Sequence, residues 1–351
     1  MNIEKKVLAD MDRCYSVAQM ELKGEPGVYF ASEGKGGSCV AFPLRDLTEK
    51  TTVWEQPGGT MGMVPIPGKP EEFLAGQKFF RLYQWEEAQI VWVRPQEDGT
   101  FQCVPILQLP YLHRFDILVR GGRSYLIACT LAAHKETRED WRCPGAVYTA
   151  PLPETPEEPL ALSIQLGGLY QNHGYQRGRW KDAQVGFVSG EQGVFVLTPP
   201  EDENTRWQVE KIMDRPVSDI ALTDIDGDGQ LELATIEPFH GKYFRVYRPK
   251  DGGWEMIYQH PEISEFYHVA TSGSIGGKPV FLGGCRREKQ QLFYLSWEQY
   301  PQGHLELTVV DEGVGPSNAI IVNLPGEDLI FSANREVAQA VVYRLQGSKE
   351  E

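Results

Sequence analysis

Short runs of hydrophobic residues recur along the whole chain, and turn residues separate them. Typical runs are GVYFAS at 27–32, RSYLIAC at 123–129 and KPVFLGG at 278–284, each preceded by Gly or a Gly/Pro pair. Few stretches exceed about fifteen residues without Gly or Pro. Since both residues interrupt helices, this pattern predicts short strands joined by turns and an all-β fold.

The hydrophobic runs repeat with a regular spacing. When one buried position of each run is taken as an anchor, consecutive anchors lie 44 to 62 residues apart, at Tyr29, Phe73, Tyr125, Phe187, Leu233, Phe281 and Ile330. A period of about 45–50 residues with four strands per repeat is typical of β-propeller blades. The pattern predicts a single-domain, seven-bladed β-propeller, with six or eight blades as alternatives, and the blades span approximately 12–57, 58–108, 109–166, 167–214, 215–261, 262–312 and 313–346.

The last repeat contains three strand-like runs, and its fourth strand is expected at the other end of the chain. The segment IEKKVLAD at 3–10 is similar to the outer strands WQVEKIM and WEMIYQH of other repeats. If it completes the last blade, no sheet edge stays open. A row of β-sandwich domains is the alternative, but one repeat frame covers the whole chain and favours the propeller.

Composition and charge exclude several classes of function. The 351 residues contain 34 Lys+Arg and 49 Asp+Glu, a formal net charge of −15, which argues against nucleic-acid or anionic-membrane partners. No apolar stretch approaches the ~18–20 residues of a membrane span. The N-terminus has no apolar signal segment, and the six cysteines form no CxxC pair, so we expect a cytoplasmic protein. The oligomeric state is left open.

One acidic loop has the spacing of a cation site. Its sequence DIDGDGQLE places carboxylates at Asp224, Asp226 and Asp228, a backbone carbonyl at Gln230 and a further carboxylate at Glu232. Oxygen ligands at alternate positions suit a hard cation. The loop resembles the calcium loop of FG-GAP/VCBS repeats, which occur in integrin-α-type propellers, and the resemblance implies Ca²⁺. We expect a structural ion, with a catalytic metal as the alternative.

Three of the seven histidines occupy one position of the repeat, at the beginning of the first strand. They are His113, His173 and His268. In a propeller these positions converge at the mouth of the central channel, where imidazoles can bind a second divalent metal or transfer protons. Tyr175 and Tyr267 lie beside two of them and are candidate proton donors. By contrast, His260 and His304 lie near outer strands and are expected at the surface.

The loops after the second strand of each blade should emerge on the same face. They carry polar and basic residues that we assign to substrate binding, namely His134, Lys135, His240, Arg286, Arg287, Asn334 and Arg335. On a chain with a strongly negative net charge, these loops predict an anionic small molecule or oligosaccharide as ligand. The loop at 131–141 is expected to hold one helical turn.

Two classes of function remain open from the sequence. The first is an enzyme that acts on a small acidic carbohydrate by elimination, dehydration or epimerisation, which requires a base and a cation that stabilises an enolate. The second is a non-catalytic propeller that binds a peptide or glycan. GxSxG, P-loop, GxGxxG and HExxH motifs are absent from the sequence.

Overall fold

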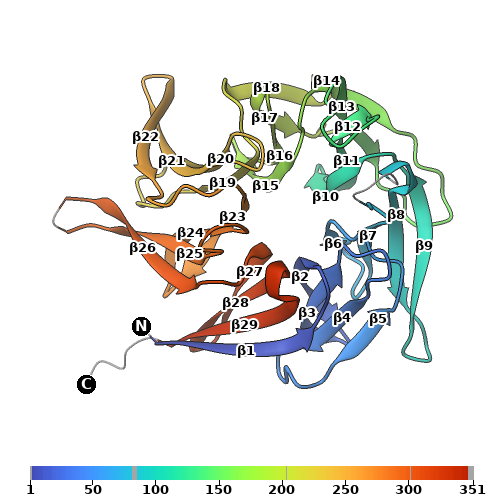
Figure 1. The fold of residues 1–351 in the computed structure, drawn as a ribbon. Coiled ribbons are helices and arrows are strands. Elements are labelled where there is room, and N and C mark those ends of the chain that lie inside the picture. Colours follow the sequence, from blue (N-terminus) through green and yellow to red (C-terminus); the bar gives the residue numbers. More distant parts are fainter. Residues whose placement is uncertain (1, 81–84, 203, 301, 347–351) are drawn as a thin grey trace. The chain divides into compact units, whose positions relative to one another are not determined.

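A computed structural model describes residues 2–80, 85–202, 204–300 and 302–346 of the chain. The described chain is almost entirely β-structure, with two short 3-10 helices, η1 (Trp85–Glu87) and η2 (Arg335–Val337). It forms seven antiparallel sheets that follow one another in sequence order (Figure 1). The predicted all-β fold of seven blades is therefore confirmed.

The chain divides into two compact units. The first unit comprises Met1–Val17 and Asp219–Glu351, and the second comprises Ala18–Ser218. Strand β2 (Cys14–Leu22) begins in the first unit and ends in the second.

The second unit contains the first four sheets. The first sheet has the order β2-β3-β4-β5, and the second and fourth sheets also keep their strands in sequence order. The strands are β3 (Glu25–Ser32), β4 (Cys39–Pro43), β5 (Thr51–Trp54), β6 (Met63–Pro65), β7 (Phe73–Gln77), β8 (Gln89–Pro95), β9 (Phe101–Gln108), β10 (Leu112–Arg120), β11 (Arg123–Thr130), β12 (Ala132–His134), β13 (Cys143–Pro151), β14 (Ser163–Leu169), β15 (Gly174–Trp180), β16 (Ala183–Gly190), β17 (Gly193–Thr198) and β18 (Gln208–Met213).

The third sheet has five strands because a short extra strand, β12, pairs with the beginning of β13. The segment 131–141 thus contributes a strand and bends where we expected a helical turn. The backbone N–H and C=O groups of β12 bond to β13, so the segment does not need a helical turn to satisfy them.

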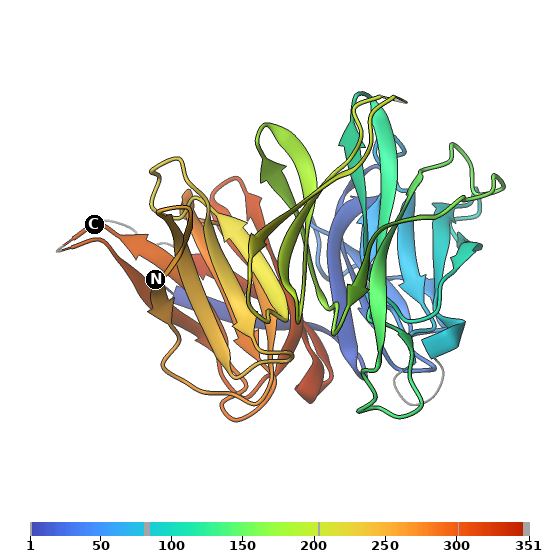
Figure 2. The ribbon, with the colours of Figure 1, turned by 90° about the horizontal axis from the view of Figure 1, so that it is seen from above.

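The first unit contains the other three sheets. Figures 1 and 2 show the strands of each sheet lying side by side. The strands are β19 (Asp219–Thr223), β20 (Glu232–Glu237), β21 (Tyr243–Lys250), β22 (Gly253–Gln259), β23 (Tyr267–Ile275), β24 (Lys278–Cys285), β25 (Leu292–Glu298), β26 (His304–Asp311), β27 (Pro316–Leu324), β28 (Glu327–Asn334), β29 (Gln339–Gln346) and β1 (Asn2–Asp10).

The N-terminal strand completes the last sheet, as predicted. Its order is β1-β29-β28-β27, and β1 pairs with β29 from Asn2–Gln346 to Asp10–Gln339. In Figure 1 the blue β1 lies alongside the red β29. This pairing covers the backbone edge of β29 that would otherwise be open.

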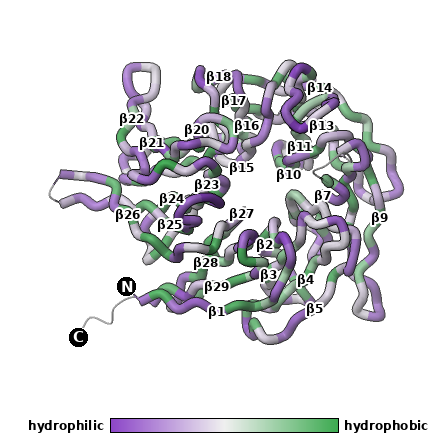
Figure 3. Tube along the Cα trace, viewed as in Figure 1, coloured by the Kyte–Doolittle hydropathy of each residue, from purple (hydrophilic) through white to green (hydrophobic). Residues whose placement is uncertain are grey.

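Burial follows the position of a strand within its sheet. Second strands such as β20 are buried along their whole length, because sheets pack on both of their faces, whereas fourth strands such as β22 are largely exposed. Between the fifth and sixth sheets, Phe244, Phe281 and Phe293 belong to one hydrophobic cluster. Hydrophobic positions recur along β24 and β25 in Figure 3. Among the described residues, no helix is long and apolar enough to cross a membrane.

Candidate functional site

The three histidines that share one repeat position lie where first strands begin. His113 is the second residue of β10, His173 directly precedes β15, and His268 is the second residue of β23. Their exposed fractions are 4%, 1% and 1%. All three imidazoles are therefore enclosed by neighbouring residues.

In the second unit, His113 and His173 lie against each other. Their ring centroids are 4.4 Å apart, with an angle of 36° between the planes, and Phe79 meets His113 edge-on. The Nδ1 atom of His173 lies 3.1 Å from the backbone oxygen of Ser218. The structure thus brings two of the three predicted histidines together. The expectation that His268 joins them concerns residues of different units and stays a prediction.

In the first unit, His268 lies in a hydrogen-bonded series. Its Nδ1 is 2.5 Å from the backbone oxygen of Ser317, and its Nε2 is 3.3 Å from the hydroxyl of Tyr15. A carbonyl oxygen can only accept, so Nδ1 carries the proton and Nε2 accepts one from Tyr15. Tyr15, the second residue of β2, was missed by the sequence analysis.

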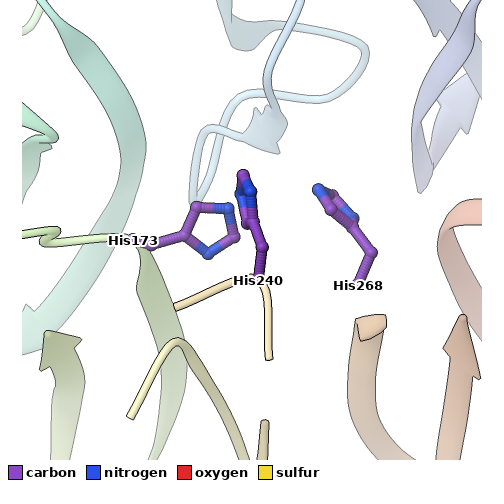
Figure 4. Close-up of side chains that lie close together, drawn as sticks. All are labelled: His173, His240 and His268. Atoms are coloured by element: carbon purple, nitrogen blue, oxygen red, sulfur yellow. The ribbon is translucent and has the colours of Figure 1, made fainter. Parts of the chain in front are cut away.

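His240 approaches His268 from the loop between β20 and β21, and Figure 4 shows both side chains. Their ring centroids are 5.9 Å apart. The His240 ring stacks on Phe239 at 4.0 Å and contacts Phe266 at 4.3 Å. Its backbone has a φ of 49°, an uncommon conformation for a residue other than glycine. Half-buried, His240 is more accessible than His268.

In the first unit, Arg286 lies next to the cluster formed by His240, Phe266 and His268. Its guanidinium is buried, lies 4.5 Å from the centroid of Phe266, and donates to Glu336 at 2.8 and 2.6 Å. Arg335 reaches the same carboxylate at 3.1 Å. Burial acts to raise the pKa of Glu336, but hydrogen bonding and charge from Arg286 outweigh it, and the pKa is lowered. Glu336 was missed, although it directly follows Arg335.

The other predicted loop residues have different environments. Arg287 is exposed, whereas Asn334 is fully buried and bonds to Ser332 and to the hydroxyl of Tyr343. Asn334 therefore belongs to a buried polar network and is not placed to meet a ligand, because its amide groups are already used within the sheet.

In the second unit, the neighbouring residues His134 and Lys135 differ in exposure. His134 is exposed, and Lys135 is buried with an exposed fraction of 7%. The Lys135 ammonium lies 3.2 Å from the ring centroid of Trp141 and 5.7 Å from that of Trp85. Burial lowers the pKa of Lys135 to about 8.

Tyr267, predicted to act beside His268, points elsewhere, which corrects the sequence analysis, whereas the role predicted for Tyr175 stays a prediction. Tyr267 is fully buried, and its hydroxyl bonds to Nδ1 of His260 and to the backbone oxygen of Glu262. Neighbouring strand residues face opposite sides of a sheet, so Tyr267 and His268 diverge. Tyr175 packs against a hydrophobic cluster, and burial followed by the charge of Asp116 raises the pKa of its hydroxyl.

The prediction that His260 is a surface residue is wrong. Its exposed fraction is 1%, and its ring lies 4.2 Å from that of Phe293. Burial lowers the pKa of its imidazole. His304, at the beginning of the outer strand β26, is exposed as expected.

The acidic loop between β19 and β20 gathers three of its carboxylates. Single oxygens of Asp224, Asp226 and Glu232 lie within 4.8 Å of one another. Asp228 is outside this group, and its carboxylate bonds to the backbone and side-chain nitrogens of Gln230. Part of the predicted ligand set is therefore assembled.

A basic side chain also reaches this loop. Arg248 of β21 pairs with Asp226 at 2.5 Å and with the fully buried Glu232 at 3.5 Å. Burial raises the pKa of Glu232, the more so because Asp226 and Asp228 are close. Oxygen donors of this kind fit a hard cation, although Arg248 already neutralises part of their charge.

Comparison with known proteins bears on the fold. No family model matches the sequence, and no curated protein matches it, so the FG-GAP/VCBS repeat type stays a prediction. A Bacteroides uniformis ATCC 8492 structure, of a protein proposed to be a 6-phosphogluconolactonase, is 12% identical with a TM-score of 0.55; the match covers 92% of this chain and 89% of that one.

A second solved structure gives the architecture a name. It is the β-propeller domain of Cps50 (Swd1) from Myceliophteria thermophila, with 10% identity and a TM-score of 0.60, and the match covers 98% of this chain and all of that one. At such identities the likeness concerns the fold alone. With seven sheets closed by the N-terminal strand, the chain has the fold of a seven-bladed β-propeller.

Proposed function

We propose that this protein is a carbohydrate-active enzyme that acts on a small acidic sugar or oligosaccharide by proton transfer, as a lyase, dehydratase or epimerase. The observation that carries the proposal is the hydrogen-bonded series from the Ser317 carbonyl through His268 to Tyr15, with His240 beside it. An imidazole held in one tautomer next to a second imidazole is suited to acid–base work near neutral pH.

The accessible member of the cluster is His240, and we assign proton transfer to it. His268 and Tyr15 have exposed fractions of 1% and 0%, so they act as positioning residues. His240 would remove a proton next to the carboxylate of the sugar acid and return it to the product or to the leaving group.

The cation that this chemistry requires would come from Arg286 and Arg335. Arg286 shares the ring of Phe266 with His240, and both guanidinium groups contact Glu336. Arg335, the more accessible of the two, would bind the substrate carboxylate, and the buried Arg286 would add its positive charge to stabilise the enolate that develops upon proton removal. Glu336 orients both groups.

Two further observations accompany this proposal. The fold is shared with a protein proposed to be a 6-phosphogluconolactonase, whose name also refers to a sugar acid, but an identity of 12% supports the fold only. Metal binding by the imidazoles is less well supported in the first unit. The carbonyl contact of His268 would leave Nε2 as the ligand atom, and Tyr15 already bonds there.

Turnover of sugar acids by the purified chain tests the enzyme proposal. Galacturonate, glucuronate, an oligogalacturonate and 6-phosphogluconolactone are incubated with the wild type and with His240→Asn, and products are followed by NMR. Loss of the general base should slow turnover by about 10²–10⁴-fold. His304→Asn is the matched control, since His304 is exposed at the beginning of an outer strand. Equal rates for wild type and His240→Asn would reject the assignment.

A non-catalytic binding protein is the second candidate. It is favoured by the burial of His113, His173 and His268, and by the bonds of His173 and His268 to backbone carbonyls, because imidazoles held in this way have a structural role that needs no substrate. On this alternative, a sugar acid or an acidic peptide would bind beside Arg335 without chemical change. Saturable binding in calorimetry, combined with unchanged ligand in the NMR assay, would select it over the enzyme.

We also propose that the loop 224–232 binds a structural Ca²⁺ through Asp224, Asp226 and Glu232. Glu232 is fully buried, and burying a carboxylate is costly unless a positive charge compensates it. Arg248 provides part of that charge, and a bound cation would provide the rest. The ion would fix the turn between β19 and β20.

A further inference from the structure

A groove of about 380 Å³ lies on the first unit, at strand ends opposite to those that carry His240 and Arg286. Its walls come from the turn after β19, the beginning of β24 and the end of β25. His240 and Arg286 belong to loops at the other ends of the same sheets. Its size falls within the ~300–1,000 Å³ of small-ligand pockets.

Two aromatic side chains line the groove. Tyr300 has an exposed fraction of 87%, the largest among the exposed hydrophobic side chains of the described chain. Trp297 is half-buried and is fixed from two directions. The Arg248 guanidinium lies 5.2 Å from its ring centroid, and a Cβ at Gly303 would come within 2.6 Å of the indole. Only glycine fits at position 303, and Trp297 is thereby held at the wall.

Each charged side chain that lines the groove has an ion-pair partner. Glu298 bonds to Lys278 at 3.3 Å, and Asp226 pairs with Arg248. A cationic ligand would meet Lys278, whereas an anionic ligand would meet Asp226 and Glu298. The site therefore offers hydrogen-bond donors and acceptors with little net charge, which favours a neutral, hydroxyl-rich ligand.

We propose that this groove binds a hexopyranose unit of a neutral glycan. The C–H face of a pyranose carries partial positive charge and complements the negative face of an aromatic ring, here Tyr300 and Trp297. Its hydroxyls find Glu298 and Lys278 as acceptor and donor. This binding site does not depend on the proposed enzyme function, because it lies at the opposite strand ends.

Isothermal titration calorimetry of the full chain with cellobiose, lactose and chitobiose tests the proposal. We expect saturable binding of at least one disaccharide by the wild type. Tyr300→Ala should weaken it about tenfold, or about 1.4 kcal/mol, because it removes the aromatic stacking contact. Tyr300→Phe keeps the ring and should keep the affinity.

Two controls separate the groove from other effects. Ile164→Ala removes another exposed hydrophobic side chain, in the second unit, and should bind as the wild type does. His240→Asn should also bind the disaccharides normally, so a failed enzyme assay leaves this test intact. The proposal is overturned if none of the three disaccharides binds, or if Tyr300→Ala binds as tightly as the wild type. Tighter binding of arginine methyl ester or glucuronate would overturn the assignment to neutral sugars.

Discussion

The Nδ1 atom of His268 lies 2.5 Å from the backbone oxygen of Ser317, which belongs to the first strand of the next sheet. The second unit repeats this relationship, with Nδ1 of His173 at 3.1 Å from the oxygen of Ser218, directly before β19. In both cases a histidine at the beginning of a first strand bonds to a backbone oxygen, which fixes the tautomer of the ring. In the first unit, the contact from His268 also ties the sixth sheet to the seventh.

The first prediction concerns this tautomer. Because the carbonyl of Ser317 can only accept, His268 should be observed as the Nδ1–H form in ¹⁵N-edited NMR spectra of its ring. Tyr15→Phe should leave the tautomer unchanged, since the Ser317 carbonyl sets it. A ring protonated at Nε2 alone would contradict the direction of the Tyr15–His268 hydrogen bond and the proton path built on it.

Deletion of residues 2–10 should destabilise the protein severely. The strand β1 pairs with β29 along its whole length, and its removal exposes the backbone groups of that strand. We expect insoluble protein or a large fall in melting temperature, measured by circular dichroism. Lys6→Ala, which keeps the backbone of β1, serves as the control. If the truncated chain melts within a degree or two of the full chain, the pairing of β1 with β29 does not stabilise the last sheet, and the prediction is wrong.

His260→Ala should lower the free energy of unfolding by about 2–4 kcal/mol. The substitution removes the hydrogen bond to Tyr267 and the ring contact with Phe293, and it leaves a cavity between sheets. His304→Ala, at an exposed position, should change stability by less than about 0.5 kcal/mol. Chemical denaturation gives the free energy of unfolding of both variants. An equal loss in the two variants would contradict the burial of His260.

These cases show which features can be predicted from the sequence. Hydrophobic runs and glycine turns are local signals, so the seven repeats, the closing strand and the first-strand positions of His113, His173 and His268 follow from them. The direction of a side chain depends on the face of the strand. That is why the sequence analysis placed Tyr267 beside His268, whereas the structure turns its hydroxyl toward His260.

Residues that act through tertiary contacts were harder to predict. Glu336 accepts hydrogen bonds from Arg286, which lies 50 residues earlier in the sequence. Tyr15, near the N-terminus, bonds to His268, which is far away in the sequence. Neither pair has a sequence spacing that marks it. In contrast, the acidic loop was recognisable because its carboxylates are neighbours in sequence, although Arg248 on β21 was not foreseen.

Calcium should stabilise the wild type, and Asp226→Ala with Asp228→Ala should abolish this effect. A ligand that binds only the folded state adds about 2.7 kcal/mol at one hundred times its Kd. The measurement is the melting temperature in Ca²⁺ and in EDTA. Arg248→Met should strengthen the calcium effect, because it removes the competing charge from Asp226 and Glu232. An identical melting temperature of the wild type with and without Ca²⁺ would reject the ion site.

The last prediction concerns Lys135 and pH. Burial lowers its pKa in the folded protein to about 8, below the ~10.4 of an unfolded chain. Between these values the unfolded state binds more protons than the folded state, so this residue makes the protein more stable as pH rises. Below pH 8 the cost of burying the charge is fully present.

Lys135→Met tests this expectation, since it keeps the apolar stem between Trp85 and Trp141 and removes the titrating group. The stability of the wild type relative to Lys135→Met should rise between pH 8 and about 10.4, as measured by urea denaturation at several pH values. Other titrating groups contribute to both proteins and cancel in the difference. Lys50→Met, at an exposed position, should show no such slope against the wild type. A relative stability of wild type over Lys135→Met that is constant or falls over this range would mean that Trp141 holds Lys135 as a fully charged ammonium.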